Sequence, residues 1–206
     1  MNDAPRTPTN LVAVSQRVDV IEGRNERRDA IDQRLAEYLS AANLIPVPVP
    51  NQLINTPAGL QPWLNAFQFI GVILSGGNNI GEVPERDSTE SALLDFARDH
   101  EIPALGICRG MQMMTIWSGG SLKPVEGHVR TRHSLSGEIT VNVNSYHDLA
   151  LSDCPTGFSV TARSEDGEIE AIRHTMHQWQ GWMWHPEREP DFAPHDIERL
   201  TELFSV

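Results

Sequence analysis

Three apolar runs restrict the fold of this chain more than any other feature. They are "LVAVS" (11–15), "FIGVILSGG" (69–77) and "IPALGI" (102–107), and none contains a charged residue. Continuous short apolar runs are typical of strands that are buried on both faces, as in a parallel sheet covered by helices. We therefore predict a strand at each run, the second ending in a glycine turn.

Helical patterns alternate with these strands. Apolar residues recur at helical spacing over 31–42, and 88–100 predicts an amphipathic helix with Asp87 or Ser88 as N-cap. The segment 109–120 predicts a helix that is closed by a glycine pair. Segment 44–50, "LIPVPVP", favours an edge strand because its prolines cannot donate ladder hydrogen bonds. This alternation indicates an α/β protein with a mostly parallel sheet.

The second half of the chain changes character. Short strands are predicted at 138–144, 158–164, 168–174 and 179–184, separated by turns, before a closing helix at 195–204. We expect them to form hairpins at one edge of the sheet. The predicted fold is thus a mostly parallel central sheet flanked by helices, with antiparallel edge strands, in a single domain over residues 1–206.

Charge and cysteine content exclude several classes of function. The formal net charge of −12 argues against binding of nucleic acid or of an anionic membrane surface, both of which reward clustered positive charge. Two cysteines, Cys108 and Cys154, do not make a disulfide framework. The opening "MNDAPRTPTN" lacks the features of a secretory signal, so we expect a cytoplasmic protein.

Cys108 lies at the predicted corner between a strand and a helix. The stretch "GICRG" (106–110) has the small-x-nucleophile-x-small pattern of a nucleophile elbow, in which a tight turn exposes the central side chain. The N-terminus of the following helix favours a thiolate there. A buried structural cysteine between two glycines is the competing interpretation.

A base for this thiol is offered by "WMWHPE" (182–187). His185 and Glu187 are two residues apart, so they project to the same side of an extended segment, as a base and its orienting carboxylate do. A polar turn after a strand is the alternative. Backbone donors for an oxyanion are expected from Gly76 and Gly77, and from the N–H of Arg109, at the same edge of the sheet.

Together, "LSGGNN" (74–79), "GICRGMQ" (106–112) and "HPE" (185–187) resemble the class I glutamine amidotransferase family, in that family's order. The resemblance covers nearly the whole chain. It implies that Cys108 is the nucleophile, His185 the general base and acid, and Glu187 the orienting carboxylate. It also implies a γ-glutamyl pocket, which is lined by Gln112 and by the segment Asn144, Ser145, Tyr146 and His147.

Within this family, "RDSTE" (86–90), "VNSYH" (143–147) and "ARSEDGEIEAI" (162–172) resemble the γ-glutamyl hydrolase branch. The opening "VSQRV" (14–18) and "RDAIDQR" (28–34) are similar to the γ-glutamyl-CDP-amidate hydrolases of capsule phosphoramidate biosynthesis. The implied reaction is cleavage of a γ-glutamyl amide through a γ-glutamyl thioester, which releases cytidine diphosphoramidate and glutamate.

Arginines that follow the first strand could bind such a diphosphate. Arg24, Arg27 and Arg28 are the candidates, because guanidinium groups pair bidentately with phosphate. Acidic residues interleave with them, so a solvated helix start explains the same stretch.

The remaining expectations concern cofactors and partners. His128 and His133 are far in sequence from any cysteine or paired carboxylate, so we predict no metal and no other cofactor. The expected partner is a small γ-glutamyl amide, and a homo-oligomer or a synthetase partner stays open. Alternative functions are a γ-glutamyl-aminobutyrate-type hydrolase, a catalytically silent γ-glutamyl-metabolite binding protein, a cysteine peptidase on a related fold and a glutaminase subunit.

Overall fold

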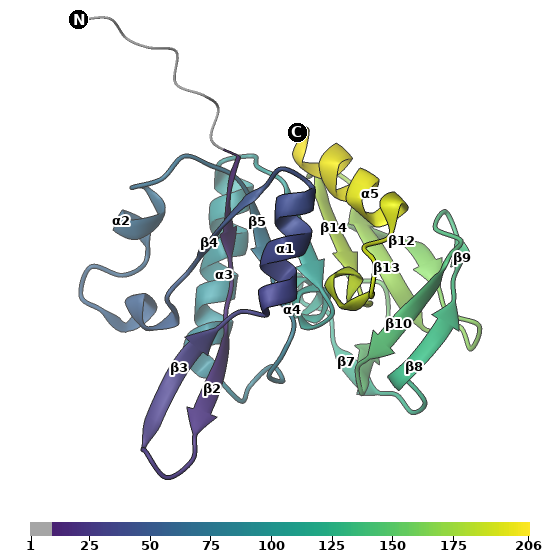
Figure 1. Cartoon of the computed structure of the whole chain (residues 1–206), viewed down its shortest axis with the longest axis horizontal. Coiled ribbons are helices and arrows are strands. Elements are labelled where there is room, and N and C mark those ends of the chain that lie inside the picture. Colours follow the sequence, from purple (N-terminus) through teal and green to yellow (C-terminus); the bar gives the residue numbers. More distant parts are fainter. Residues whose placement is uncertain (1–9) are drawn as a thin grey trace, which may run out of the picture.

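The computed structural model describes residues 10–206 and contains one eight-stranded sheet (Figure 1). Residues 1–9, on which most of the signal-sequence expectation rests, lie outside the described residues. The strand order is β4-β1-β5-β6-β14-β13-β12-β9, with parallel pairing from β4 to β14 and antiparallel pairing from β14 to β9. The bounds are β1 Leu11–Val14, β4 Ile45–Pro48, β5 Phe69–Leu74, β6 Ala104–Ile107, β9 Ser136–Gly137, β12 Phe158–Arg163, β13 Ile169–His174 and β14 Trp179–Trp182.

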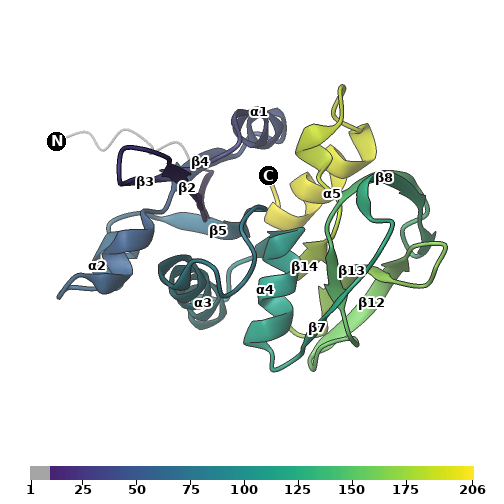
Figure 2. The same ribbon diagram turned by 90° about the horizontal axis from the view of Figure 1, so that it is seen from below.

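Helices cover both faces of this sheet (Figure 2). Helices α1 (Gln33–Ala41) and α5 (Pro194–Phe204) lie on one face, and α3 (Pro84–Asp99) and α4 (Arg109–Trp117) lie on the other. The short helix α2 (Gln61–Leu64) precedes β5, and 3₁₀ turns occur at Asn51–Asn55 and Pro186–Arg188. The predicted α/β sheet flanked by helices is confirmed. Within residues 10–206, no helix combines the length and apolar character needed to span a bilayer.

Three two-stranded sheets extend from this core. They pair β2 (Arg17–Ile21) with β3 (Glu26–Ala30), β8 (Val129–Ser134) with β10 (Asn142–Tyr146), and β7 (Leu122–Pro124) with β11 (Leu149–Leu151). The first is a hairpin that projects from the end of β1 (Figure 1). The alternative interpretation of this arginine-rich stretch, a solvated helix start, is therefore wrong. Val18 and Val20 alternate at strand spacing, and the turn contains Gly23 and Asn25 at positive φ, which suits a hairpin.

Three other expectations are corrected in detail. Helix α3 begins at Pro84 rather than near Ser88, because proline suits the first position of a helix. The strand expected at 138–144 is β10, which begins at Asn142 and pairs with β8 outside the main sheet. Strand β14 is not an edge strand, since it lies parallel to β6 inside the sheet and carries the antiparallel strands on its other side.

Candidate active site

Three neighbouring parallel strands deliver the predicted site residues to one edge of the sheet. Leu74 of β5 is paired with Gly106 of β6, and Ile107 of β6 is paired with Trp182 of β14. The loop of residues 75–77, called the glycine loop below, follows β5, and Cys108 and His185 follow the carboxyl ends of β6 and β14. Ligands of open α/β sheets bind at such ends.

Cys108 lies at a sharp corner that only small neighbours permit. Its φ is 51° and its ψ is −105°, and helix α4 begins at the next residue. A Cβ on Gly106 would lie 2.5 Å from the carbonyl carbon of Gly110, and a Cβ on Gly110 would lie 2.2 Å from the carbonyl oxygen of Leu74. The two glycines therefore allow β5, β6 and α4 to pack closely while the backbone turns through Cys108.

His185 is buried between the thiol and a carboxylate. Its Nδ1 lies 2.6 Å from Oε1 of Glu187. Burial disfavours the imidazolium, but the charges of Glu187 and the Cys108 thiolate outweigh it and raise the pKa of His185 to about 10. The raised pKa leaves His185 protonated at neutral pH, and an imidazolium beside a cysteine is the group that can stabilise its reactive thiolate form.

Asn144 fixes the backbone of His185. Its side-chain amide donates to the carbonyl of His185 at 2.7 Å and accepts from the N–H of His185 at 2.9 Å. The ring of Tyr146 meets the His185 ring edge-on at 5.8 Å, and the Arg188 guanidinium lies over that same tyrosine. Strand β10 therefore lies directly beside the base.

The other residues expected in a γ-glutamyl pocket have internal partners. Ser145 donates to the carbonyl of His128 at 2.7 Å, and His147 contacts the carbonyl of Leu149 through Nδ1 at 3.0 Å. Gln112 donates to that same carbonyl at 2.9 Å. These contacts hold the segment around residues 144–149 against helix α4, so its substrate role stays a prediction.

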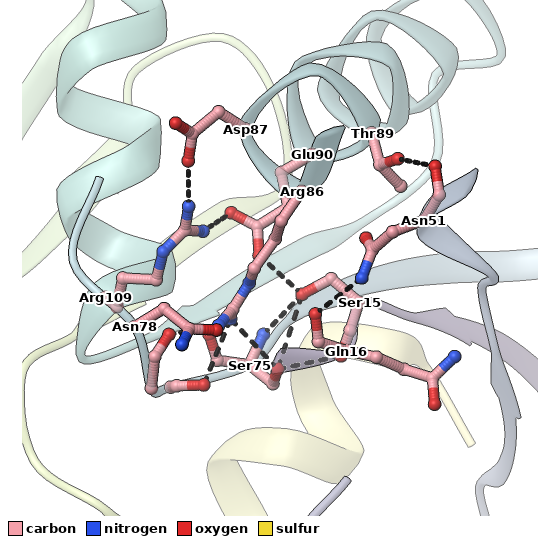
Figure 3. Close-up of polar contacts among 12 residues, drawn as sticks. Ser15, Gln16, Asn51, Ser75, Asn78, Arg86, Asp87, Thr89, Glu90 and Arg109 are labelled. Carbon is pink, nitrogen blue, oxygen red and sulfur yellow. Dashed lines mark hydrogen bonds and ion pairs between the residues drawn. The ribbon is translucent and has the colours of Figure 1, made fainter. Parts of the chain in front are cut away.

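Arg86 of α3 holds the glycine loop, and sequence reasoning did not single it out (Figure 3). Its guanidinium donates to the carbonyls of Ser75 at 2.7 Å and Gly76 at 3.0 Å, and also to the carbonyl of Gly77. In a trans peptide the N–H points opposite to the C=O, so the N–H groups of Gly76, Gly77 and Asn78 point away from Arg86. Within residues 10–206, no hydrogen bond occupies the N–H of Gly76 or Gly77.

Gly76 is packed against the base itself. A Cβ at this position would lie 2.6 Å from Cε1 of His185. The donors predicted at Gly76 and Gly77 therefore lie beside the imidazole. The N–H of Arg109, in the first turn of α4, has no intrahelical acceptor either.

The side chains of Arg86 and Arg109 share a buried ionic network with Glu90. Arg86 pairs with Glu90 at 3.0 Å, and Arg109 pairs with both Asp87 and Glu90 (Figure 3). Burial lowers the pKa of each guanidinium to about 9, which leaves both protonated at neutral pH. The sequence holds one indication of this role of Arg86: it begins the stretch "RDSTE" and so lies one helical turn before Glu90, its ion-pair partner.

A cavity of about 230 Å³ opens beside His185 and Glu187. Arg17 and Arg188 line it, together with Asp19, Asp32 and residues 75–77. A Cβ on Gly77 would lie 3.3 Å from Cδ of Arg17, so this arginine lies against the glycine loop.

The three arginines predicted for a diphosphate do not line this cavity. Arg24 is exposed in the hairpin turn, Arg27 pairs with Glu85 of α3, and Arg28 pairs with Glu26. Arg28 is directly opposite Asp19 in the hairpin and shares the face of Asp19 and Arg17, whereas Arg27 is on the other face.

The structure also brings together histidines that sequence reasoning set aside. Ligating atoms of His128, His133 and Glu170 all lie within 4.8 Å of one another. These histidines are far from a paired carboxylate in the sequence but lie beside Glu170 in the fold, so the sequence separation does not argue against a metal.

The chain matches the family model of class I glutamine amidotransferases over residues 26–202. It is 31% identical over 141 residues to the γ-glutamyl-CDP-amidate hydrolase of Campylobacter jejuni, covering 66% of this chain and 70% of the relative. It is 29% identical over 218 residues to the γ-glutamyl-γ-aminobutyrate hydrolase of Escherichia coli O157:H7, covering 82% and 85%.

A solved structure agrees in fold. A Thermoplasma acidophilum protein described as a GMP synthase component superposes with a TM-score of 0.71 at 18% identity, covering 95% of this chain and 92% of that one. This chain therefore belongs to the class I glutamine amidotransferase family. It is an enzyme of the type that acts on amide C–N bonds, and its similarity to two γ-glutamyl hydrolases agrees with the predicted branch.

Proposed function

We propose that this enzyme hydrolyses a γ-glutamyl amide through a γ-glutamyl thioester on Cys108, and that the amide is γ-glutamyl-CDP-amidate. The observation that carries the proposal is the grouping of Cys108 on its strained corner with the buried pair His185 and Glu187.

In this mechanism the Cys108 thiolate attacks the γ-carbonyl carbon of the substrate. The oxyanion that forms accepts hydrogen bonds from the N–H groups of Gly77 and Arg109. The His185 imidazolium protonates the leaving nitrogen, the C–N bond breaks, and the thioester remains on the enzyme. Neutral His185 then takes a proton from water, which attacks the thioester and releases glutamate.

The cavity beside His185 supports an anionic leaving group. Arg17 and Arg188 line it, and each guanidinium keeps donors for phosphate oxygens beside its contact with Asp19 or Glu187. Asn78 connects the hairpin to the glycine loop, because its amide accepts from the N–H of Val18 at 2.8 Å and donates to the carbonyl of Val18 at 3.1 Å. A leaving group in this cavity would thus contact the hairpin and the glycine loop together.

The test is glutamate release from γ-glutamyl-CDP-amidate, γ-glutamyl-aminobutyrate and glutamine, each with wild type and Cys108→Ala. We expect the highest kcat/KM for the nucleotide amidate and no turnover by the variant. Preference for γ-glutamyl-aminobutyrate would reject the nucleotide substrate while keeping the hydrolase mechanism. Preference for glutamine would indicate a glutaminase that supplies a synthetase. Turnover by Cys108→Ala would reject the nucleophile.

A further inference from the structure

A buried cluster of histidines and one carboxylate lies outside the catalytic groups described above. His128 precedes β8, His133 lies within β8, His147 lies between β10 and β11, and Glu170 lies on β13. The side chains of His128 and His147 are each 1% exposed, and Glu170 is fully buried. Strand β13 belongs to the main sheet, so this cluster joins the outer β8–β10 sheet to the core.

Three ligating atoms of this cluster are spaced as they are around a tetrahedral metal ion. Nδ1 of His128 is 3.2 Å from Nε2 of His147, and these nitrogens are 3.3 and 3.4 Å from Oε1 of Glu170. Ligands bound to zinc at about 2.0–2.1 Å in tetrahedral geometry are about 3.4 Å apart. The three separations match that value.

In each imidazole, the nitrogen that faces away from Glu170 is hydrogen-bonded, and this bond identifies the other nitrogen as the one free to bind a metal ion. Nδ1 of His147 is 3.0 Å from the carbonyl of Leu149, which can only accept, so this nitrogen carries the proton. Nε2 of His128 is 2.9 Å from the carboxylate of Asp166, which fixes the proton there in the same way. In the neutral imidazoles, both lone pairs therefore point toward Glu170. Histidines that bind metals have this outer arrangement, with the second N–H donated to a carboxylate or a carbonyl.

Polar atoms in this cluster also lack hydrogen bonds. Within residues 10–206, neither carboxylate oxygen of Glu170 has a hydrogen-bond partner, and Nε2 of His133 has none. Burying an unpaired carboxylate beside two nitrogen lone pairs is unfavourable, because every group is then an acceptor. A cation at the centre satisfies all of them together.

We propose that His128, His147 and Glu170 bind a divalent transition-metal ion, with Zn²⁺ as the ion that suits two imidazoles and a carboxylate. His133, whose ligating atom lies within 4.8 Å of those of His128 and Glu170, supplies the fourth ligand. The ion has a structural role. It anchors the corner at His147 to β13, and through Asn144 and Tyr146 the same segment contacts His185. The proposal does not depend on the identity of the substrate's leaving group.

The test measures metal binding directly on untagged protein, since a histidine tag would itself bind zinc. Metal content is measured by inductively coupled plasma mass spectrometry after purification without chelator. The protein is then stripped with EDTA and titrated with Zn²⁺ by calorimetry. We expect one equivalent of Zn²⁺ and a higher Tm with the ion than without it. Co²⁺ in place of Zn²⁺ should give the intense visible absorption of a tetrahedral site.

Matched variants locate the site. His128→Gln and Glu170→Gln should abolish stoichiometric binding, and Asp166→Asn should weaken it by about 10–100-fold because it loosens the His128 ring. His174→Gln is the control, since His174 and His177 form another imidazole pair with ring centroids 4.6 Å apart. It should leave binding unchanged.

Two results would overturn the proposal. One is wild-type protein that holds no stoichiometric metal, shows no tetrahedral Co²⁺ spectrum and has the same Tm with Zn²⁺ as with EDTA. In that case the negative charge of Glu170 is balanced by protons on the imidazoles beside it, and not by a metal ion. The other is equal Zn²⁺ binding by wild type and a folded Glu170→Gln variant, which would locate the ion elsewhere. The wild-type Co²⁺ spectrum requires no variant, so a misfolded variant does not leave the proposal undecided.

Discussion

At the scale of single residues, Cys108 combines reactivity with backbone strain. Its φ of 51° with ψ of −105° is a conformation that residues with a Cβ rarely adopt. The sequence predicts this corner from the apolar strand before Cys108, the helical pattern after it and the small residues on both sides, which suit a sharp turn. The close approach of Gly106 to Gly110, and of Gly110 to Leu74, explains why larger residues do not fit.

The strain predicts an unusual stability order among variants without the thiol. Cys108→Gly should be more stable than Cys108→Ala by about 1 kcal/mol, because relief of about 1–3 kcal/mol of strain exceeds the entropic cost of glycine of about 0.5–1 kcal/mol. Urea unfolding of the two variants measures the difference. If Cys108→Ala is the more stable variant, the corner is not strained.

His185 predicts a pH dependence of stability. Its pKa is raised from 6.5 to about 10, so the folded state binds a proton that the unfolded state loses earlier. This contribution is fully present below about pH 6.5 and is lost as the pH rises toward 10. The difference in unfolding free energy between wild type and His185→Gln, measured by urea unfolding, should therefore shrink between pH 6.5 and pH 10. A constant difference across this range would contradict the raised pKa of His185.

At the scale of elements, helix α3 orients the glycine loop through one side chain. Arg86→Lys keeps the positive charge but loses the planar fork that reaches three carbonyls. We expect a loss of unfolding free energy of about 1.5–3 kcal/mol, the value of one charge-assisted hydrogen bond. We also expect kcat to fall about 100-fold, as when an oxyanion donor is displaced.

The same substitution on the exposed side of α3 is the control. Arg98 pairs with Asp95 and Asp99 at the surface, so Arg98→Lys should leave stability and kcat unchanged. Equal behaviour of Arg86→Lys and Arg98→Lys in both measurements would exclude a positioning role for Arg86.

The sequence predicts the elements of the core better than those of the surface. The runs that became β1, β5 and β6 are apolar throughout, so burial alone identifies them. The hairpin β2–β3 was missed because charged residues fill the exposed positions of its strands and hide the alternation of Val18 and Val20. Its contact with Asn78 depends on residues 60 positions apart, which no local pattern reveals.

At the scale of the whole molecule, the hairpin and the core sheet together form the cavity beside His185. The alternation of side chains in the hairpin directs Arg17 and Arg28 to one face and Arg27 to the other. The sequence could identify a cluster of arginines here, but the strand register decides which of them faces the site. The histidine cluster was missed for a related reason, because His128, which precedes β8, meets Glu170 of β13 only in the folded chain.

This geometry predicts which arginines contribute to the binding of a nucleotide amidate. Arg17→Ala and Arg188→Ala should each raise the KM for γ-glutamyl-CDP-amidate about 10-fold, the effect of one charge-assisted hydrogen bond of about 1.5 kcal/mol, and Arg28→Ala should raise it less. The KM for γ-glutamyl-aminobutyrate should stay constant.

Arg24→Ala and Arg27→Ala are the matched controls, since Arg24 is in the turn and Arg27 pairs with Glu85. A larger effect on KM at these two positions than at Arg17 would move the diphosphate to the other face of the hairpin.

The central claim is a covalent γ-glutamyl thioester on Cys108, and acid quenching during turnover tests it most directly. Intact-protein and peptide mass spectrometry of the quenched enzyme should show a γ-glutamyl adduct on the peptide that contains Cys108. The peptide with Cys154, whose thiol pKa is raised by burial, should be unmodified. An adduct on Cys154, or wild-type turnover of the γ-glutamyl amide with no adduct at Cys108 at any quench time, would contradict the account.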